Sequence, residues 1–300
     1  MLSVVICAFN EETNLPRAVS SAKSIADEIV VVDTESTDRT AEIARKLGCT
    51  VYSHKYPGIV EPVRNFAIGK ARGDWIFLLD ADEEIGKPLA AAIKQKISAD
   101  HIDYYRIPRK NIIFGKWITS DHWWPDYVYR LFKKGSLTWD PNIHSIPFTK
   151  GEGGDFPADE NLALIHHHYD SISQFTLRLD RYTDFQSREI INGGYNFAWQ
   201  DIIIHPFQEF SRQYFARRGY RDGFHGLALS FLQAFSSLVV YLKLWEQGGF
   251  IDHRLELKQL PSAFLPSLSE IRWWYYDSLA KTSPFPQNLW WKLKKRFKSV

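Results

Sequence analysis

Short apolar runs alternate with longer amphipathic stretches over the first third of the chain. The apolar runs predict buried strands at residues 2–8, 28–32, 50–53 and 75–79. The stretches between them carry apolar residues at helical spacing and predict helices at residues 13–23, 40–47 and 59–71. This alternation predicts an α/β fold whose sheet is mostly parallel, with right-handed crossovers.

Polar residues follow three of these strands where each strand ends. They occupy residues 10–12, 33–38 and 80–84, and the last segment reads Asp80-Ala81-Asp82-Glu83-Glu84. Open α/β sheets bind ligands at the carboxyl ends of their strands, so we expect Asp80 and Asp82 to project into a cleft. Carboxylate oxygens suit Mg²⁺ or Mn²⁺, although an isolated Asp-x-Asp is also compatible with an acidic turn.

The pattern changes after residue 84. Residues 88–98 predict a surface helix, and residues 104–107 begin a strand that we expect Pro108 to interrupt. The segment Lys133-Lys134-Gly135-Ser136 predicts a hairpin turn into a strand at residues 137–139.

Asp126 is a candidate catalytic base. Trp123, Trp124 and Tyr127 flank it, and aromatic side chains of this kind can stack on a sugar ring. A carboxylate there could take the proton from an attacking hydroxyl group. Alternatively, Asp126 caps a turn after Pro125 and the tryptophans belong to the core. The residues alone leave both interpretations open.

Histidines provide further candidate ligands. His144 could complete a metal shell or contact phosphate, and a structural histidine held by hydrogen bonds is the alternative. His166, His167 and His168 are consecutive, so their side chains point to alternating faces of an extended segment. We therefore expect at most His168, or one neighbour, to face the site.

The second half of the chain predicts helices. Asp170 or Ser171 with Gln174 forms a capping box, and the helix that follows has an apolar stripe of Ile172, Phe175, Leu179 and Tyr182. Residues 226–242 are apolar but shorter than a bilayer span, which favours an amphipathic helix docked on protein or in a leaflet. Its expected apolar face consists of Leu227, Phe231, Leu238, Leu242 and Trp245.

Residues 290–298 combine two tryptophans, Trp290 and Trp291, with lysines and an arginine. Interfacial membrane anchors have this composition, and a solvated basic tail is the alternative. We favour contact with lipid head groups because adjacent tryptophans are costly to leave in water.

Composition narrows the class of protein. The 300 residues are 45% hydrophobic, enough for one large globular domain or two modest ones. The 37 basic and 35 acidic residues nearly cancel, and no recognition module is readable, so we expect no nucleic-acid partner. Cys7 and Cys49 fit a reducing compartment, and the N-terminal residues lack the basic start of a signal peptide.

Three segments, in their order and spacing, resemble glycosyltransferase family 2. They are Val4-Val5-Ile6-Cys7-Ala8-Phe9-Asn10-Glu11-Glu12, residues 29–40 beginning Ile29-Val30-Val31-Val32-Asp33, and residues 73–83 ending Asp80-Ala81-Asp82-Glu83. Pro125-Asp126 before Arg130-Leu131-Phe132, His144, and residues 217–246 resemble the branch of lipopolysaccharide-core glucosyltransferases. The resemblance implies a GT-A fold and an inverting transfer from a nucleotide-diphosphate sugar, and we expect a UDP-sugar as the donor.

The resemblance also implies roles for residues of this sequence. Nucleotide-sugar binding falls to Asn10, Glu11, Asp33, Arg64, Asn65, Asp80 and Arg130, metal binding to Asp82 and His144, and base catalysis to Asp126. Asp33 would hold the base or ribose, Asp80 the ribose, and Arg130 the diphosphate. Two positions depart from the family pattern, because Glu35 stands where glycine is usual and Ser145 where the branch has glutamate.

We therefore predict a GT-A nucleotide-sugar-binding domain at residues 1–168, a helical membrane-associating extension at 169–248 and a Trp-rich basic tail at 249–300. The expected activity is a transfer assisted by Mg²⁺ or Mn²⁺ to a lipid-linked or polysaccharide-core acceptor. We expect a cytoplasmic protein, peripheral on the inner face of the cytoplasmic membrane. The alternatives are transfer onto a polyprenyl phosphate, which is already anionic and needs no base, and a non-catalytic nucleotide- or glycan-binding relative.

Overall fold

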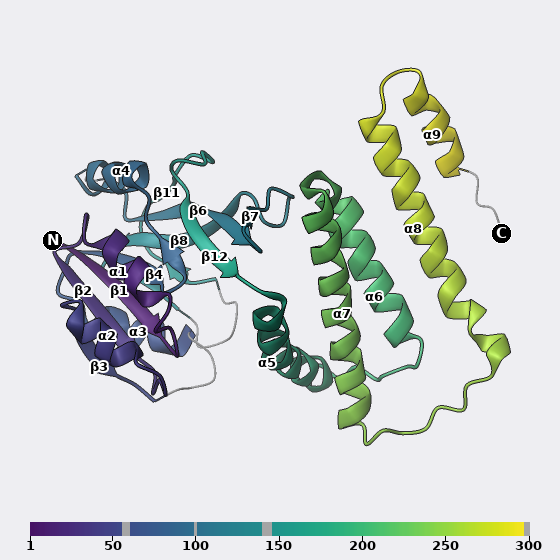
Figure 1. The fold of residues 1–300 in the computed structure, drawn as a ribbon, viewed down its shortest axis with the longest axis horizontal. Coiled ribbons are helices and arrows are strands. Elements are labelled where there is room, and N and C mark those ends of the chain that lie inside the picture. The colour runs from purple at the N-terminus through teal and green to yellow at the C-terminus, as the bar shows by residue number, and fades with distance from the viewer. Residues whose placement is uncertain (56–60, 99–100, 140–145, 297–300) are drawn as a thin grey trace. The chain divides into compact units, whose positions relative to one another are not determined.

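The computed structural model describes residues 1–55, 61–98, 101–139 and 146–296. These residues form two compact units (Figure 1). Met1–Trp117 and Trp123–His168 make up the first unit, and Ile118–His122 and Tyr169–Val300 the second. The second unit therefore includes a short segment, residues 118–122, that lies between two segments of the first unit in the sequence.

The first unit is built on four parallel strands, as the hydrophobic pattern predicts. The strand β1 (Leu2–Ala8) lies between β2 (Glu28–Asp33) and β4 (Trp75–Asp80), and β3 (Thr50–Ser53) lies beyond β2. Every residue of β1 is buried, because helices cover both faces of a parallel sheet. The prediction of an α/β fold is confirmed.

Alternate residues of β1 enter the two halves of the core. Val4 and Ile6 pack with residues of α1 (Leu15–Ala22), α2 (Thr40–Lys46) and α4 (Lys87–Ile97). Val5 and Cys7 pack on the opposite face with α3 (Glu61–Lys70). The helices thus form a layer on each side of the sheet and leave its carboxyl edge for the loops.

Antiparallel strands extend the sheet beyond β4. The order continues through β8 (Asp126–Lys133), β6 (Tyr104–Ile113), β12 (Leu164–Tyr169) and β5 (Glu83–Glu84). The short strands β7 (Lys116–Trp117) and β11 (Gly153–Asp155) also pair with β6. Because β5 directly follows the Asp-x-Asp and pairs with β12, it brings residues 166–168 beside Asp82.

Two expectations for this region are wrong. Pro108 does not interrupt the strand, since β6 continues to Ile113 after a register shift between Tyr105 and Arg106. Proline is tolerated in strands near irregularities of this kind. The turn at residues 133–136 forms, but the strand after it, β9 (Leu137–Thr138), pairs with β10 (Phe148–Thr149) and not with β8.

The second unit is helical. Its long helices are α5 (Ile172–Asn192), α6 (Asp201–Ser211), α7 (Phe224–Gln247), α8 (Pro261–Thr282) and α9 (Gln287–Arg296). Short helical turns occupy η1 (Arg212–Ala216), η2 (Gly219–Asp222) and η3 (Leu257–Gln259). Residues 249–296 therefore contain a pair of helices, where the sequence predicted only a basic tail.

The capping box of α5 is confirmed, but its stripe is not. The Ser171 hydroxyl accepts a hydrogen bond from the Gln174 amide at 3.1 Å, and the Gln174 side chain accepts one from the Asp170 amide at 2.7 Å. Ile172 and Tyr182 are exposed. The buried stripe is instead spaced by four residues and consists of Phe175, Leu179, Thr183 and Ser187.

Helix α7 packs through one side and exposes part of its predicted apolar face. Small side chains fill much of its buried side, which consists of Gly226, Leu229, Ser230, Ala234, Val240 and Leu244. Phe231 and Leu242, two residues of the predicted apolar face, are exposed, and whether that face docks on protein or in a leaflet stays a prediction. The helix has 24 residues and is long and apolar enough to cross a membrane by length and composition alone, and 28% of its most apolar window is buried. It is longer than the apolar run from which we predicted it.

Residues 118–122 belong to the helical unit because side chains of that unit bind them. The buried Asp222 carboxylate accepts hydrogen bonds from the amides of Thr119 at 2.9 Å and Ser120 at 3.0 Å. Arg218 forms a paired ion contact with Asp121. The chain thus leaves and rejoins the first unit just before the candidate base at residue 126.

Candidate active site

Two of the predicted site carboxylates lie at the carboxyl ends of strands that flank β1. Asp33 on β2 is opposite Ala8, and Asp80 on β4 is opposite Cys7. Two strand spacings separate their backbones, which is about 10 Å. The structure therefore brings together residues that are 47 positions apart in the sequence, at one edge of the sheet.

The loop after β1 forms hydrogen bonds with the loop after β2. The Asn10 side-chain oxygen accepts hydrogen bonds from the amides of Thr37 at 2.8 Å and Asp38 at 3.4 Å. Glu11 accepts one from the side chain of Asn14 at 2.8 Å. Asn10 therefore shapes the loop after β2, and direct contact of Asn10 or Glu11 with a nucleotide sugar stays a prediction.

Asp33 carries a buried oxygen that faces no protein donor. Its Oδ2 accepts a hydrogen bond from the Ser36 amide at 3.2 Å. Its Oδ1 has no partner among the described residues, although the side chain is only 7% exposed. Because buried acceptors are almost always satisfied, this oxygen is complementary to an N–H or O–H group of a ligand. Glu35, two residues on, has φ of 59°, in the left-handed region where glycine is favoured.

Arg64 and Asn65 start from the same helix but serve different partners. Arg64 Nη2 lies 3.4 Å from Asp80 Oδ1, so Arg64 belongs to the site. Asn65 donates to the Trp139 carbonyl at 2.7 Å and accepts from the Trp139 amide at 2.9 Å. The Asn65 amide thus fixes the chain at Trp139, and its predicted role in the nucleotide pocket gains no geometric support.

Asp80 is held by a buried arginine. Arg130 Nη2 contacts Asp80 Oδ2 and donates to Glu83 Oε1 at 2.7 Å. Glu83 in turn accepts from the Asp80 amide at 3.0 Å. Arg130 is 2% exposed, so in this structure it acts on the site through Asp80, and its contact with a diphosphate stays a prediction.

The charges of this cluster determine its ionisation. Burial opposes the charged form of Asp80, but the positive charges of Arg130 and Arg64 outweigh it and lower the pKa of Asp80. Burial likewise opposes the charge of Arg130, and the carboxylates of Asp80 and Glu83 outweigh it and raise the pKa of Arg130. The cluster is therefore ionised near neutral pH, with guanidinium and carboxylate groups interleaved.

The same chain of ion pairs reaches the candidate base. Arg109 Nη1 lies 3.6 Å from Glu83 Oε1, and Arg109 Nη2 and Nε donate to Asp126 Oδ2 at 2.6 and 2.8 Å. Sequence reasoning missed Glu83 and Arg109. Glu83 lies within the recognised acidic run, but nothing in the sequence shows that its side chain is fully buried between two arginines.

Asn111 forms hydrogen bonds with both Asp126 and His166, and the sequence analysis did not identify it as a site residue. The Asn111 Nδ2 group donates to the Trp123 carbonyl at 2.9 Å and to Asp126 Oδ2 at 3.2 Å. Its Oδ1 therefore faces His166 Nδ1, at 2.6 Å. Since Oδ1 can only accept, His166 Nδ1 carries a hydrogen, and Nε2 is the nitrogen that presents a lone pair in the neutral form of the ring.

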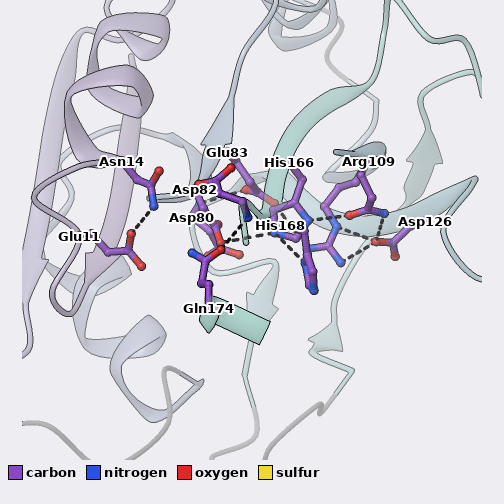
Figure 2. A network of polar contacts seen from close by, with 12 residues as sticks. Glu11, Asn14, Asp80, Asp82, Glu83, Arg109, Asp126, His166, His168 and Gln174 are labelled. Carbon is purple, nitrogen blue, oxygen red and sulfur yellow. Dashed lines mark hydrogen bonds and ion pairs between the residues drawn. The ribbon is translucent and has the colours of Figure 1, made fainter. Parts of the chain in front are cut away.

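That lone pair faces Asp82. His166 Nε2 lies 3.5 Å from Asp82 Oδ2 and 3.4 Å from His168 Nδ1 (Figure 2). His167, between them in sequence, points the other way and contacts Glu84 at 3.1 Å. The predicted alternation of the three histidines is thus observed, and two of them, not one, lie on the side of Asp82.

A divalent cation fits this arrangement in one specific mode. A carboxylate oxygen and an unprotonated ring nitrogen that face each other are complementary to a cation between them. In the part of the chain that the structure describes, no group of three or more His, Cys, Asp and Glu side chains is arranged to hold a metal ion. A cation at Asp82 would therefore take most of its ligands from phosphate and water, as Mg²⁺ commonly does. His144, the other predicted ligand, lies outside the described residues.

Aromatic residues flank the candidate base in the sequence. Trp123 packs edge-on against His168 with 5.4 Å between ring centroids, and Trp124 packs against Trp117 at 5.1 Å. Trp123, Trp124 and Tyr127 are all half-buried. They are neither fully buried nor fully exposed, and contact of these rings with a sugar stays a prediction.

Comparison with known proteins agrees with this geometry. Residues 3–151 match the family model described as glycosyl transferase family 2. An uncharacterized glycosyltransferase of Rickettsia bellii is 31% identical over 256 residues, which cover 82% of this chain and 86% of that protein. The lipopolysaccharide core biosynthesis glycosyltransferase LpsC of Rhizobium meliloti is 24% identical over 82% of this chain and 92% of its own length.

Solved structures include residues 1–349 of Staphylococcus aureus TarS, which aligns over 98% of this chain and 87% of that chain. Its identity to this chain is 16% and its TM-score is 0.43. The family model and the R. bellii relative both identify the family of this chain. Its α/β fold, with acidic residues at the carboxyl edge of the sheet, is the GT-A fold. The chain belongs to glycosyltransferase family 2 and is a glycosyltransferase.

Proposed function

We propose that this glycosyltransferase is an inverting enzyme that moves a sugar from a UDP-sugar to a lipid-linked or polysaccharide-core acceptor. Residues 1–168 form the catalytic domain in this proposal, and residues 169–300 the part that meets the membrane. The observation that carries it is the line of polar groups along one sheet edge, from the unsatisfied oxygen of Asp33 through Asp80 to Asp82. A nucleotide, a diphosphate and a sugar would follow that line in order.

Asp126 is the proposed base. The three contacts made to its carboxylate by Arg109 and Asn111 all go to Oδ2. Oδ1 is therefore the oxygen that can take the proton from the acceptor hydroxyl. As that hydroxyl oxygen bonds to the anomeric carbon, the bond from this carbon to the diphosphate oxygen breaks, and the nucleotide diphosphate leaves with the electron pair.

The other residues of the network hold the groups that react. Arg109 keeps the Asp126 carboxylate in one orientation, because its Nε and Nη2 groups both donate to Oδ2. Arg130 and Arg64 keep Asp80 charged and oriented. Asp82 and His166 would hold Mg²⁺ or Mn²⁺, which when bound neutralises charge that develops on the leaving diphosphate.

Two observations support the proposed acceptor, namely the name of a relative and the exposed hydrophobic side chains of the helical unit. LpsC of R. meliloti is named for lipopolysaccharide core biosynthesis, which suggests a glycan core or glycolipid acceptor for this chain too. All exposed large hydrophobic side chains of the described residues except Met1, Ile146 and Phe148 lie in the helical unit. We propose that this unit attaches the enzyme peripherally to the inner face of the cytoplasmic membrane, where a lipid-linked acceptor is within reach.

A second candidate is transfer onto a polyprenyl phosphate, which is favoured by the basic residues of the helical unit. Such an acceptor is already an anion and needs no base, so Asp126→Asn would retain full activity. Loss of activity in variants of the helical unit's arginines, with an active Asp126→Asn, would select this candidate.

One assay tests the main proposal. The enzyme is incubated with Mn²⁺ and a panel of UDP-, GDP- and dTDP-sugars, and slow release of the nucleotide is measured. We expect release from a UDP-sugar, and its loss in Asp82→Ala. The matched control is Asp155→Ala, which removes an exposed aspartate of the same unit that pairs with Arg106. Equal release by Asp82→Ala and the parent would contradict the proposed site.

A further inference from the structure

Helices α8 and α9 form a hairpin that turns small or polar side chains inward and large apolar ones outward. Figure 1 shows the two helices running antiparallel. The buried positions of α8 are Ala263, Ser267, Asp277 and Ala280. Leu265, Leu268 and Tyr275 are exposed by 60%, 51% and 48%. Water would favour the opposite arrangement, since burying large apolar groups is what stabilises a helix pair in solution.

Helix α9 packs on α8 through one aromatic contact, exposes its other large apolar side chains and adds charge. Trp291 faces α8 and stacks on Tyr276 with 5.8 Å between ring centroids. Leu289, Trp290 and Leu293 are about half exposed. At the tip between the helices, Phe285 is 77% exposed. Trp291 thus packs within the hairpin, whereas its neighbour Trp290 is half exposed.

The cations of α9 accompany this apolar face. The helix sequence is Gln-Asn-Leu-Trp-Trp-Lys-Leu-Lys-Lys-Arg and contains no acid. Lys295 is engaged with Asp277 at 2.6 Å. Among the described residues, no acidic partner meets Lys292, Lys294 or Arg296, and Lys294 lies 5.0 Å from the Trp290 ring. Leucine, tryptophan and unpaired cations on one short helix are complementary to the interface of an anionic bilayer.

We propose that the α8–α9 hairpin is the element that binds the enzyme to anionic lipid, with Leu289, Trp290, Leu293 and Phe285 at the level of the acyl chains. This deepens the proposed peripheral attachment and rests on it. A second copy of the chain fits the face less well, because a symmetric contact through α9 would bring cation against cation. Anionic head groups satisfy those charges instead.

Vesicle flotation of the full-length protein tests the proposal. Phosphatidylcholine vesicles with and without phosphatidylglycerol are used, and we expect binding only to the anionic ones. The triple variant Leu289→Gln, Trp290→Gln, Leu293→Gln should lower the partition coefficient by about tenfold or more. Lys292→Gln, Lys294→Gln, Arg296→Gln should lower it on the order of a hundredfold, at about fivefold for each charge.

The matched control is Phe148→Gln, which removes an aromatic side chain that is 68% exposed in the other unit and should float like the parent. Nucleotide release from the sugar donor is measured on the same samples without vesicles. A parent that releases nucleotide but does not float overturns the hairpin proposal alone, and a parent that floats without releasing nucleotide overturns the proposed activity alone. If the parent is a dimer without lipid and the apolar triple variant is a monomer, the exposed face binds a second copy of the chain and the lipid proposal is wrong.

Discussion

Arg109 binds Asp126 through two nitrogens that both reach the same carboxylate oxygen, at 2.6 and 2.8 Å. These residues are opposite each other on β6 and β8. The pairing leaves one carboxylate oxygen for chemistry and fixes its direction. It also links the proposed base, through the buried Glu83, to the arginine that holds Asp80.

Removing the charge of Asp126 tests its role as the base. Asp126→Asn should lower turnover by about 10²–10⁴-fold, because the amide cannot take the acceptor's proton, and should leave nucleotide binding nearly intact. Steady-state kinetics and calorimetric titration with the nucleotide separate the two effects. Asp155→Asn, which alters an aspartate bound by two nitrogens of Arg106, serves as the control. Turnover at the parental rate in Asp126→Asn would remove Asp126 from the mechanism.

The tautomer of His166 is open to direct measurement. Nitrogen NMR should show the neutral ring protonated at Nδ1, because Asn111 can only accept there. Addition of Mg²⁺ with nucleotide diphosphate should shift the Nε2 resonance, as expected for a nitrogen that faces the cation. His167→Gln, on the opposite side of β12, should respond to Mg²⁺ like the parent. A ring protonated at Nε2 would be incompatible with the proposed cation position.

Loss of the Asn111 amide should have two measurable consequences. Asn111→Leu removes the acceptor of a buried imidazole hydrogen and a donor to Asp126, and should cost about 1–3 kcal/mol of unfolding free energy. It should also abolish the preference for the Nδ1 tautomer. Urea unfolding gives the first quantity and NMR the second, and an unchanged tautomer would show that Asn111 does not orient the ring.

Glu35 adopts a backbone conformation that suits glycine, with φ of 59°. Glu35→Gly should therefore raise the unfolding free energy by about 1 kcal/mol, since the left-handed region costs a residue with a Cβ about that much. Glu42→Gly is the control with opposite sign, because it places glycine inside α2 and should destabilise by about 1 kcal/mol. Thermal and urea unfolding measure both. A destabilised Glu35→Gly would mean that the glutamate side chain contributes more than its backbone costs.

Asp80 should make stability depend on pH in acid. Its pKa is lowered in the folded protein, so its ionised form contributes stability above the unfolded pKa of about 3.9, and that contribution is lost as pH falls through the folded pKa. The difference in unfolding free energy between the parent and Asp80→Asn should thus be largest near neutral pH and shrink below about pH 4. Urea titrations across this range test it, and a difference independent of pH would contradict the assigned ion pairs.

The parallel half of the fold could be predicted from the sequence, since it depends on local periodicity. Buried runs such as residues 75–79 fall in the observed strands, and the acidic turn after them lies at the carboxyl edge, as expected for β4. Short-range capping was equally readable at Ser171. These features depend on neighbours in the chain, which the sequence displays directly.

Only the tertiary structure decided which residues complete the site. The roles of Glu83, Arg109 and Asn111 depend on residues that are distant in the sequence. Asn111 and His166, for example, are 55 positions apart, and such pairings depend on strand order and register. Which apolar side chains of α7 are exposed likewise follows from the side on which the helix packs. Periodicity alone placed Phe231 and Leu242 on one apolar face and left open whether protein or lipid covers it. Local propensity thus determined the elements and the acidic edge, while long-range packing determined which charges meet there and which apolar side chains remain exposed.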